Sequence, residues 1–308
     1  KLFYCAVPPP LYKTIFQHLA DSGLTKPCGA GEGWTRVMVE KPFGNDLKTA
    51  MELEKILARL FKEVQIFRID HYLAKEMMQN ILSFRFANTI FQPLWNKDSI
   101  ERVDIRLNER MGVEERGAFY DGTGALRDVG QNHLLQMLAF IAMNQPKSFT
   151  ADDIRRERAA VLKKLHRFTE QEITKSTFRA QFRDFRRVPE VSRDSKTETY
   201  FRLRTSIDAP HFKGVPIYIE GGKYMPYDKK EILITFREPK PCLSCEGGGN
   251  YQNIVSFCFS PEASIKIRFW AKKPGLVFEN EPRIFDFMLA KEESAEYIES
   301  YEKILFDC

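Results

Sequence analysis

The stretch Leu2-Phe3-Tyr4-Cys5-Ala6-Val7 has the apolar character of a buried strand, and similar short runs occupy residues 36–40 and 64–69. Between these runs, apolar residues recur at helical spacing over residues 11–19 and 47–60. Strands that alternate with helices form parallel sheets, because each helix returns the chain to the edge at which the next strand begins. The first 70 residues therefore predict an α/β segment built on a parallel sheet.

From Lys75 onward the pattern changes to long helices, predicted over residues 76–86 and 132–143, and to many strands. The strands are predicted over residues 103–108, 197–207, 217–219, 231–236, 253–259 and 264–270. Several of them alternate apolar and polar residues, as an antiparallel sheet with one covered face requires. We therefore place a domain boundary near Asp70. Over residues 71–308 we expect an α+β domain with a broad, mainly antiparallel sheet and no parallel pairing after Pro216.

The composition is that of a soluble globular protein, with 43% hydrophobic and 29% charged residues among 308. No apolar run approaches the roughly 20 residues that a membrane-spanning helix needs, and the first residues do not resemble a signal peptide. We expect a cytoplasmic protein with no membrane partner.

The net charge of +5 fits an anionic substrate, but 47 basic against 42 acidic residues fall short of a nucleic-acid-binding surface. The densest basic stretch, residues 155–164, carries apolar residues at helical spacing. Its charges therefore indicate the solvated face of an amphipathic helix, and we expect no nucleic-acid partner.

The six cysteines are scattered along a long chain, which favours free thiols over a disulfide framework. Cys242 and Cys245 have the spacing of half a zinc site, but no second pair follows, so we expect no metal. The glycines of residues 29–33 precede a strand, whereas a dinucleotide-binding loop follows a strand and opens a helix. We interpret them as a surface connection, and the glycines of residues 246–250 as a hairpin or loop.

Polar residues follow two of the predicted parallel strands, where open α/β sheets bind their ligands. Lys41 follows the second strand and Asp70 follows the third. His71 and Lys75 are four residues apart, so one helical turn would place both on one face, where with Tyr72 they could bind a phosphate dianion. The alternative is that Asp70 caps a helix and the residues after it are solvated.

His133 opens an otherwise apolar helix and is expected to be partly buried. Such a histidine is commonly a hydrogen-bonded core residue. It can instead act as a general base, provided that a carboxylate orients its other ring nitrogen. The spacing leaves open whether Asp70 or Asp128 is that carboxylate.

Taken together, these segments resemble the glucose-6-phosphate dehydrogenase family, in its order and over nearly the whole chain. The matching segments are Glu40-Lys41-Pro42-Phe43-Gly44, Arg68-Ile69-Asp70-His71-Tyr72-Leu73, Lys75-Glu76, Gln79-Asn80, Arg85-Phe86-Ala87-Asn88, Arg116-Gly117, Tyr120-Asp121, Arg127-Asp128, Gln131-Asn132-His133-Leu134-Leu135-Gln136, Val215-Pro216, Gly222-Lys223 and Lys273-Pro274-Gly275.

The resemblance implies oxidation of glucose 6-phosphate at its anomeric carbon to the 6-phosphogluconolactone, the first step of the pentose phosphate pathway. The hydride passes to NADP, or to NAD. The resemblance makes His133 the general base and Asp70 its charge-stabilising partner. His71, Tyr72 and Lys75 match the phosphate-binding residues. Residues that match sugar-binding positions are Lys41, which also matches a position near the nicotinamide, Glu109, Asp128 and Lys223. The family also implies a homodimer.

The chain departs from the family at several places. It lacks the family's glycine-rich fingerprint and its usual C-terminal stretch, so we expect an internal piece that opens within a Rossmann sheet, residues 1–70 being the C-terminal part of an NAD(P)-binding domain. Ala74 stands where the family has Gly, and Glu220 stands where an Arg is common. Asp228 replaces a second lysine, and Lys229 follows one position later. The alternative to an enzyme is a non-catalytic remnant that kept the fold and lost cofactor binding.

Overall fold

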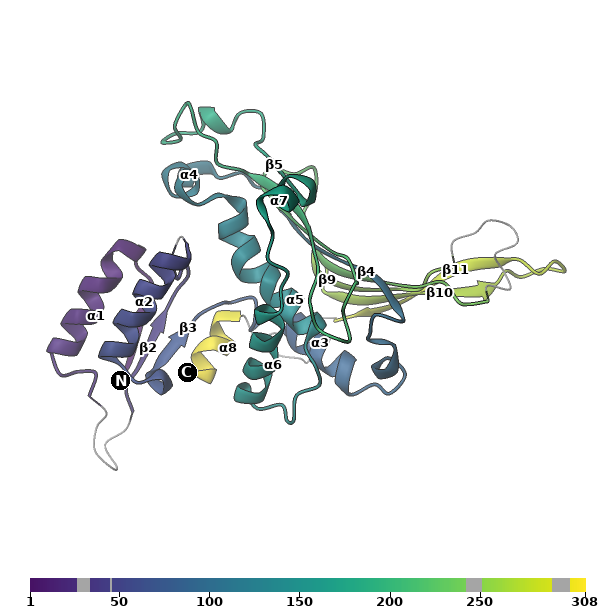
Figure 1. The fold of residues 1–308 in the computed structure, drawn as a ribbon, viewed down its shortest axis with the longest axis horizontal. Helices are drawn as coiled ribbons and strands as arrows, with labels where there is room; N and C mark the ends of the chain where they lie inside the picture. Colours follow the sequence, from purple (N-terminus) through teal and green to yellow (C-terminus); the bar gives the residue numbers. More distant parts are fainter. Residues whose placement is uncertain (27–33, 45, 242–250, 290–299) are drawn as a thin grey trace. The chain divides into compact units, whose positions relative to one another are not determined.

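The computed structural model describes residues 1–26, 34–44, 46–241, 251–289 and 300–308. The chain forms two compact units (Figure 1). The first contains Lys1–Lys75 together with the C-terminal helix α8 (Ser300–Asp307), and the second begins at Glu76 and includes the last strand, β11 (Asn280–Met288).

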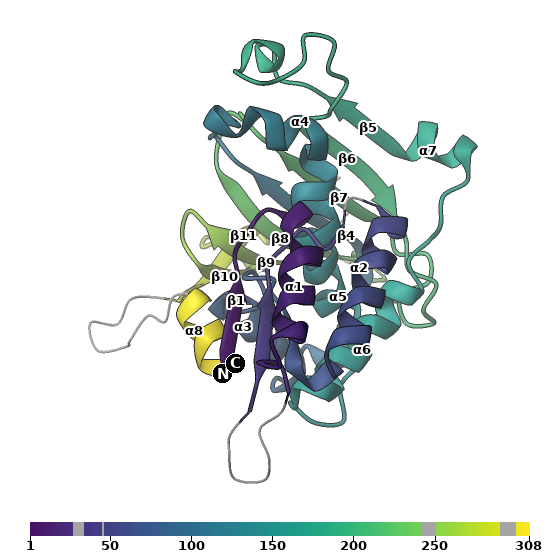
Figure 2. The same ribbon diagram turned by 90° about the vertical axis from the view of Figure 1, so that its left-hand side faces the viewer.

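The first unit is built on a three-stranded parallel sheet, in the order β1 (Leu2–Cys5), β2 (Arg36–Val39) and β3 (Ile66–Arg68). Its connections contain η1 (Pro9–Leu11), α1 (Tyr12–Asp21), α2 (Leu47–Leu60) and η2 (Glu63–Gln65). The predicted alternation of strands and helices and the parallel pairing are therefore confirmed. In Figure 2, α1 and α2 lie side by side.

Alternate side chains of β2 face opposite ways and build two small cores. Val37 and Val39 pack with the apolar faces of α1 and α2, including Phe16 and Leu57. Met38 points to the other face, where it packs with Ile69, Ile304 and Cys308. The second core thus joins β2 to α8, which comes from the opposite end of the chain.

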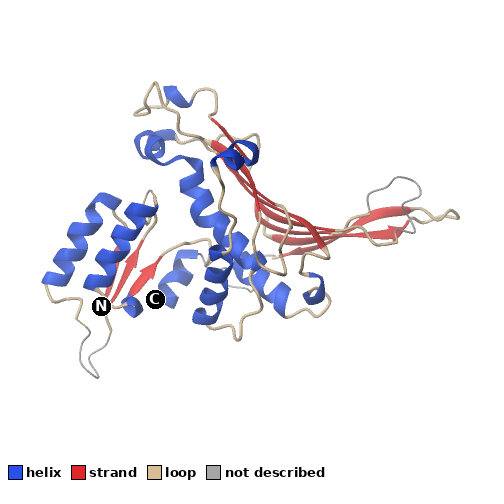
Figure 3. Cartoon of the chain, in the orientation of Figure 1, coloured by secondary structure: helices blue, strands red, loops and turns tan. Residues whose placement is uncertain are grey.

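The second unit is an eight-stranded sheet in the order β11-β10-β9-β8-β4-β7-β6-β5, with helices alongside it (Figure 3). The strands are β4 (Ile100–Asn108), β5 (Thr177–Ala180), β6 (Tyr200–Thr205), β7 (Ile217–Gly222), β8 (Lys229–Phe236), β9 (Ile254–Ser260), β10 (Ser264–Lys272) and β11. The helices are α3 (Glu76–Phe86), η3 (Gln92–Leu94), η4 (Glu114–Arg116), α4 (Gly117–Ala125), η5 (Leu126–Leu134), α5 (Leu135–Ala142), α6 (Ala151–Lys163), α7 (Glu170–Ser176) and η6 (Phe185–Arg187).

The sheet is mainly antiparallel, as predicted, but the expectation of no parallel pairing after Pro216 is wrong. Strand β7 pairs with β4 in parallel, with Val103 opposite Ile217 and Asn108 opposite Gly222. The helices between β4 and β5 return the chain to the edge where β4 begins, as in any crossover between parallel strands. Strands β6 and β7 then each reverse direction, so β7 runs the same way as β4.

The buried end of α5 is held by side chains that donate to its last carbonyl groups. The guanidinium of Arg85 donates to the carbonyl oxygens of Phe140 and Met143. The indole of Trp95 donates to Ile141 O at 2.8 Å. Since the last carbonyls of a helix have no partner within it, these donors fix the position of α5 beneath the sheet.

Candidate active site

Lys41 and Asp70 both follow strands that end at one edge of the parallel sheet. Strands β2 and β3 run in register, with Val39 opposite Arg68, and Ile69 N donates to Val39 O at 2.9 Å. The segments that follow β2 and β3 therefore leave the sheet at the same edge. The peptide bond between Lys41 and Pro42 is cis, and the hydroxyl of Tyr12 donates to Glu40 O at 2.7 Å.

His71 and Lys75 both contact one buried ring, that of Tyr72. Tyr72 is 5% exposed, its ring centroid lies 4.9 Å from that of His71, and the Lys75 ammonium lies 5.2 Å from it. The backbone here forms successive turns rather than the helical turn considered from the sequence, and α3 begins only at Glu76. Asp70 Oδ1 accepts from Tyr72 N at 3.0 Å, so Asp70 also caps this turn.

Asp128 and His133 lie on η5, a π-helical segment that follows a break at Gly124. Gly124 has φ 77°, where a Cβ atom would lie 2.6 Å from a Glu198 carboxylate oxygen. The same carboxylate accepts from Leu126 N at 3.0 Å, and Glu198 O accepts from Ala125 N at 3.0 Å. Glu198 therefore caps the helix that carries both residues, and both are buried, His133 to 2% exposure.

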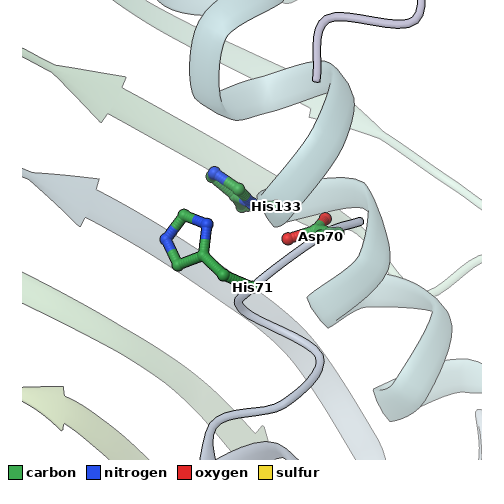
Figure 4. A group of neighbouring side chains, drawn as sticks. All are labelled: Asp70, His71 and His133. Carbon is green, nitrogen blue, oxygen red and sulfur yellow. The ribbon is translucent and has the colours of Figure 1, made fainter. Parts of the chain in front are cut away.

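Figure 4 draws Asp70 and His71 on the loop that follows β3, and His133 on its helix. Asp70 and His71 follow the end of β3, in a turn that the Asp70 side chain caps. His133 lies on a helix that begins after the break at Gly124.

Glu109 forms an ion-pair cluster with Lys223 and Lys230 at the ends of β4, β7 and β8. Because β4 and β7 are parallel, both strands end at the same edge, and Glu109 N donates to Gly222 O at 3.0 Å. The Lys223 ammonium contacts one Glu109 carboxylate oxygen, and Lys230 Nζ lies 3.1 Å from the other. Burial opposes the charge of Glu109, but the two lysines outweigh it and hold the pKa of Glu109 below its usual range.

A cavity of about 330 Å³ opens beside this cluster. It is lined by Met111, Gly112, Val113, Glu114, Glu115, Arg116, Tyr120 and Lys223. The cavity thus brings a substrate-binding candidate, Lys223, together with a second cation, Arg116.

Lys230 is the member of this cluster that the sequence analysis missed. It lies on the apolar face of β8, in alternation with Ile232 and Ile234, and a cation on the core face of a strand end is the signal that could have found it. Lys229 points to the other face and pairs with Glu231 at 3.1 Å.

Glu220 and Asp228, two residues that depart from the family pattern, each accept a hydrogen bond. Glu220 Oε1 accepts from Asn108 Nδ2 at 3.0 Å, and Asp228 Oδ1 accepts from Arg110 N at 2.9 Å.

Lys41 stands at the carboxyl edge of the parallel sheet, where open α/β sheets bind their ligands. The connection from β1 to α1 contains Pro8, Pro9 and Pro10, which have no backbone N–H to offer a pyrophosphate. The connection from β1 to α1 therefore does not form a glycine-rich phosphate loop.

Three predicted features lie outside the described residues: the glycines of residues 29–33 and 246–250, and the pair Cys242 and Cys245. Cys5, Cys258 and Cys308 are free thiols, as expected. Among the helices that the structure describes, none combines the length and apolar character of a membrane span.

Comparisons with known proteins match both units to one family. Residues 1–80 match the sequence model of the glucose-6-phosphate dehydrogenase NAD binding domain, and residues 82–308 match that of the C-terminal domain. The glucose-6-phosphate 1-dehydrogenase of Streptococcus pneumoniae is 38% identical over 100% of this chain and 63% of its own length. That of Aggregatibacter actinomycetemcomitans is 40% identical, over 99% of this chain and 63% of its own.

Solved structures agree. A glucose-6-phosphate dehydrogenase in complex with its substrate glucose-6-phosphate superposes with a TM-score of 0.86 at 34% identity, over 99% of this chain and 63% of that one. The glucose-6-phosphate 1-dehydrogenase from Mycobacterium avium superposes with a TM-score of 0.85 at 33% identity, over 99% of this chain and 64% of that one. The chain thus spans slightly less than two thirds of these relatives. Both units and nearly every residue align, so the chain belongs to the glucose-6-phosphate dehydrogenase family.

Proposed function

We propose that this chain carries the substrate site of a glucose-6-phosphate 1-dehydrogenase, which oxidises glucose 6-phosphate at C1 to 6-phosphogluconolactone. The observation that carries the proposal is the group around Tyr72, in which His71 and Lys75 contact the same buried ring. These two residues supply cationic or donor groups, and such groups form strong charge-assisted bonds with a phosphate dianion.

In the proposed reaction His133 accepts the proton of the anomeric hydroxyl. A neutral imidazole can do so near pH 7, and the Asp70 carboxylate stabilises the imidazolium that results. Loss of this proton gives the C1 oxygen alkoxide character, which favours departure of the hydride from C1 as the carbonyl forms. Lys41 and Lys223 would offset the developing negative charge. Glu109 and Asp128, together with these lysines, hold the sugar hydroxyls.

A bound nicotinamide dinucleotide would supply the hydride acceptor, and we propose NADP, with NAD as the other possibility. Lys41 is the described residue that would lie against the nicotinamide. The second candidate is a non-catalytic scaffold of the same fold. The retained set of Lys41, Asp70, His71, Lys75 and His133 favours the enzyme.

We further propose that the protein is a homodimer in the cytoplasm, without membrane or nucleic-acid partners. An Arabidopsis thaliana relative that is 36% identical over 309 residues is named a cytoplasmic glucose-6-phosphate 1-dehydrogenase.

The test is the turnover of the full-length protein with His133→Asn. We expect turnover to fall by about a hundredfold or more, with the KM for glucose 6-phosphate nearly unchanged, because only proton transfer is lost. His18→Asn, on the exposed side of α1, is the matched control and should retain wild-type turnover. A wild-type protein that oxidises no glucose 6-phosphate would favour the scaffold instead.

Asp70→Asn separates the two roles of Asp70. The amide oxygen can still accept from Tyr72 N, so the cap remains while the charge is lost. We expect turnover to fall as the imidazolium loses its partner. If turnover stays normal and only stability changes, Asp70 serves as a cap alone.

A further inference from the structure

Helix α8 places an aromatic residue, Tyr301, against the proposed phosphate-binding residue His71. The two rings are stacked, with centroids 5.8 Å apart and planes inclined by 14°. The imidazole also meets the Tyr72 ring, at 4.9 Å and 58°. His71 therefore contacts an aromatic ring from its own loop and another from the C-terminal helix.

The hydroxyl end of Tyr301 lies at the segment that precedes Lys41. Tyr4 donates its hydroxyl to Glu40 Oε1 at 2.8 Å, and the Tyr301 hydroxyl interacts with the same carboxylate. Burial and the negative charge of Glu40 raise the pKa of both tyrosines, so both stay protonated donors at neutral pH. Glu40 thus holds the Tyr301 ring at its far end.

Helix α8 is itself fixed in the first unit. Ile304 and Cys308 pack with Met38 and Ile69, and the Arg36 guanidinium donates to Cys308 O. These contacts set the position of the Tyr301 backbone, and Glu40 sets the position of its hydroxyl. With its backbone and hydroxyl fixed in this way, the Tyr301 side chain presents the face of its ring to His71.

We propose that Tyr301 is a positioning residue that holds the His71 imidazole in one orientation for phosphate binding. This proposal rests on the function proposed above. A histidine side chain on a loop has two torsions to fix when it binds a ligand, and a ring already in contact with Tyr72 and Tyr301 loses less freedom on binding. An aromatic pair of this kind contributes enough to change binding by about two- to tenfold.

The first test uses the full-length protein without ligand. The chain has five histidines, so the His71 ring signals can be assigned in a histidine-labelled NMR spectrum with the help of His71→Asn. In Tyr301→Leu the part of the ring-current shift of the His71 protons that comes from the Tyr301 ring should disappear. In Tyr301→Phe it should persist, because the ring remains and only the hydroxyl is lost. Unchanged His71 signals in Tyr301→Leu would overturn the proposal.

The second test measures glucose 6-phosphate binding and turnover. For Tyr301→Leu we expect KM and Kd to rise by about two- to tenfold with kcat nearly unchanged, and for Tyr301→Phe most of the affinity to return. Leu305→Ala, an exposed change on the same helix, controls for damage to α8 and should leave both constants unchanged. Equal losses in Tyr301→Leu and Leu305→Ala would show that Tyr301 only stabilises α8, which overturns the proposal.

The two proposals fail separately. If the His71 NMR signals of the wild-type protein do not change when glucose 6-phosphate is added, the phosphate role of His71 is overturned. The positioning of His71 for phosphate is then overturned as well. A wild-type protein that binds the sugar phosphate, but whose Tyr301→Leu variant binds it equally well, would overturn the role of Tyr301 alone.

Discussion

Lys75 places its ammonium over the Tyr72 ring, and its substitution is expected to separate a sugar-phosphate enzyme from a free-sugar dehydrogenase. A dianion forms charge-assisted bonds with the lysine that a neutral hydroxymethyl group cannot form. Lys75→Ala should weaken glucose 6-phosphate binding by about ten- to a hundredfold and leave free glucose unaffected. The measurement is kcat/KM for both sugars, with the exposed Lys55→Ala of α2 as control. Equal losses for the two sugars would mean that Lys75 supports structure only.

Glu109 makes stability depend on pH. Lys223 and Lys230 hold the pKa of Glu109 below its usual range, so its contribution to folding is present above the unfolded pKa and is lost as pH falls through the folded pKa. The pair is partly exposed, so Glu109→Gln should lower the unfolding free energy by roughly 1 kcal/mol at pH 7. The difference from wild type should shrink below about pH 4. Urea unfolding at pH 7, 5 and 3, with the exposed Glu52→Gln as control, measures it.

At the scale of elements, amphipathic spacing located α2 and α3 because each buries one face in a local, regular pattern. The same spacing missed the start of the helix at His133, which was expected near Asn132 and begins at Leu126. That start depends on Glu198, which is distant in sequence and caps the helix, so no local pattern reports it. Strand β11 was missed because most of its residues are exposed and give no apolar alternation.

Gly124 offers a test of how the helix of His133 is positioned. Gly124→Ala should destabilise the protein by about 1–3 kcal/mol, because the positive φ disfavours Ala and the new Cβ would displace the Glu198 cap. Turnover should fall as well. Gly122→Ala is the matched control: its Cβ would meet no atom within 4 Å, so it should be neutral or slightly stabilising. The measurement is the thermal unfolding temperature of each variant. Equal shifts for Gly124→Ala and Gly122→Ala would contradict this account.

At the scale of the whole molecule, the second unit offers a charged sheet face. Val103 and Ile105 point into the core, so Asp104 and Arg106 alternate to the opposite face. There Arg106 pairs with Glu231 at 3.0 Å. The sequence predicted this broad sheet from its alternation. The parallel pairing of β4 with β7 could not be predicted, because it depends on how the intervening helices return the chain.

We expect two copies to associate through this sheet, as the family resemblance implies, in an isologous dimer. Light scattering should then give twice the mass of the chain. Arg106→Glu should shift the protein toward monomer, because it breaks the pair with Glu231 of the same chain and adds a negative charge to the face proposed to associate. A clean monomer of the wild-type protein at high concentration would contradict the prediction.

Helix α8 also sets the stage of synthesis at which the first unit can complete its folding. During synthesis the strands β2 and β3 leave the ribosome early, yet Met38 and Ile69 receive their partners only when Ile304 and Cys308 emerge. Met38 and Ile69 therefore lack these two partners while the second unit is being made, and transiently exposed apolar side chains are what chaperones bind. In a ribosome-bound chain halted before Ser300, the first unit should remain incompletely folded. In a chain extended past Cys308, it should complete its folding.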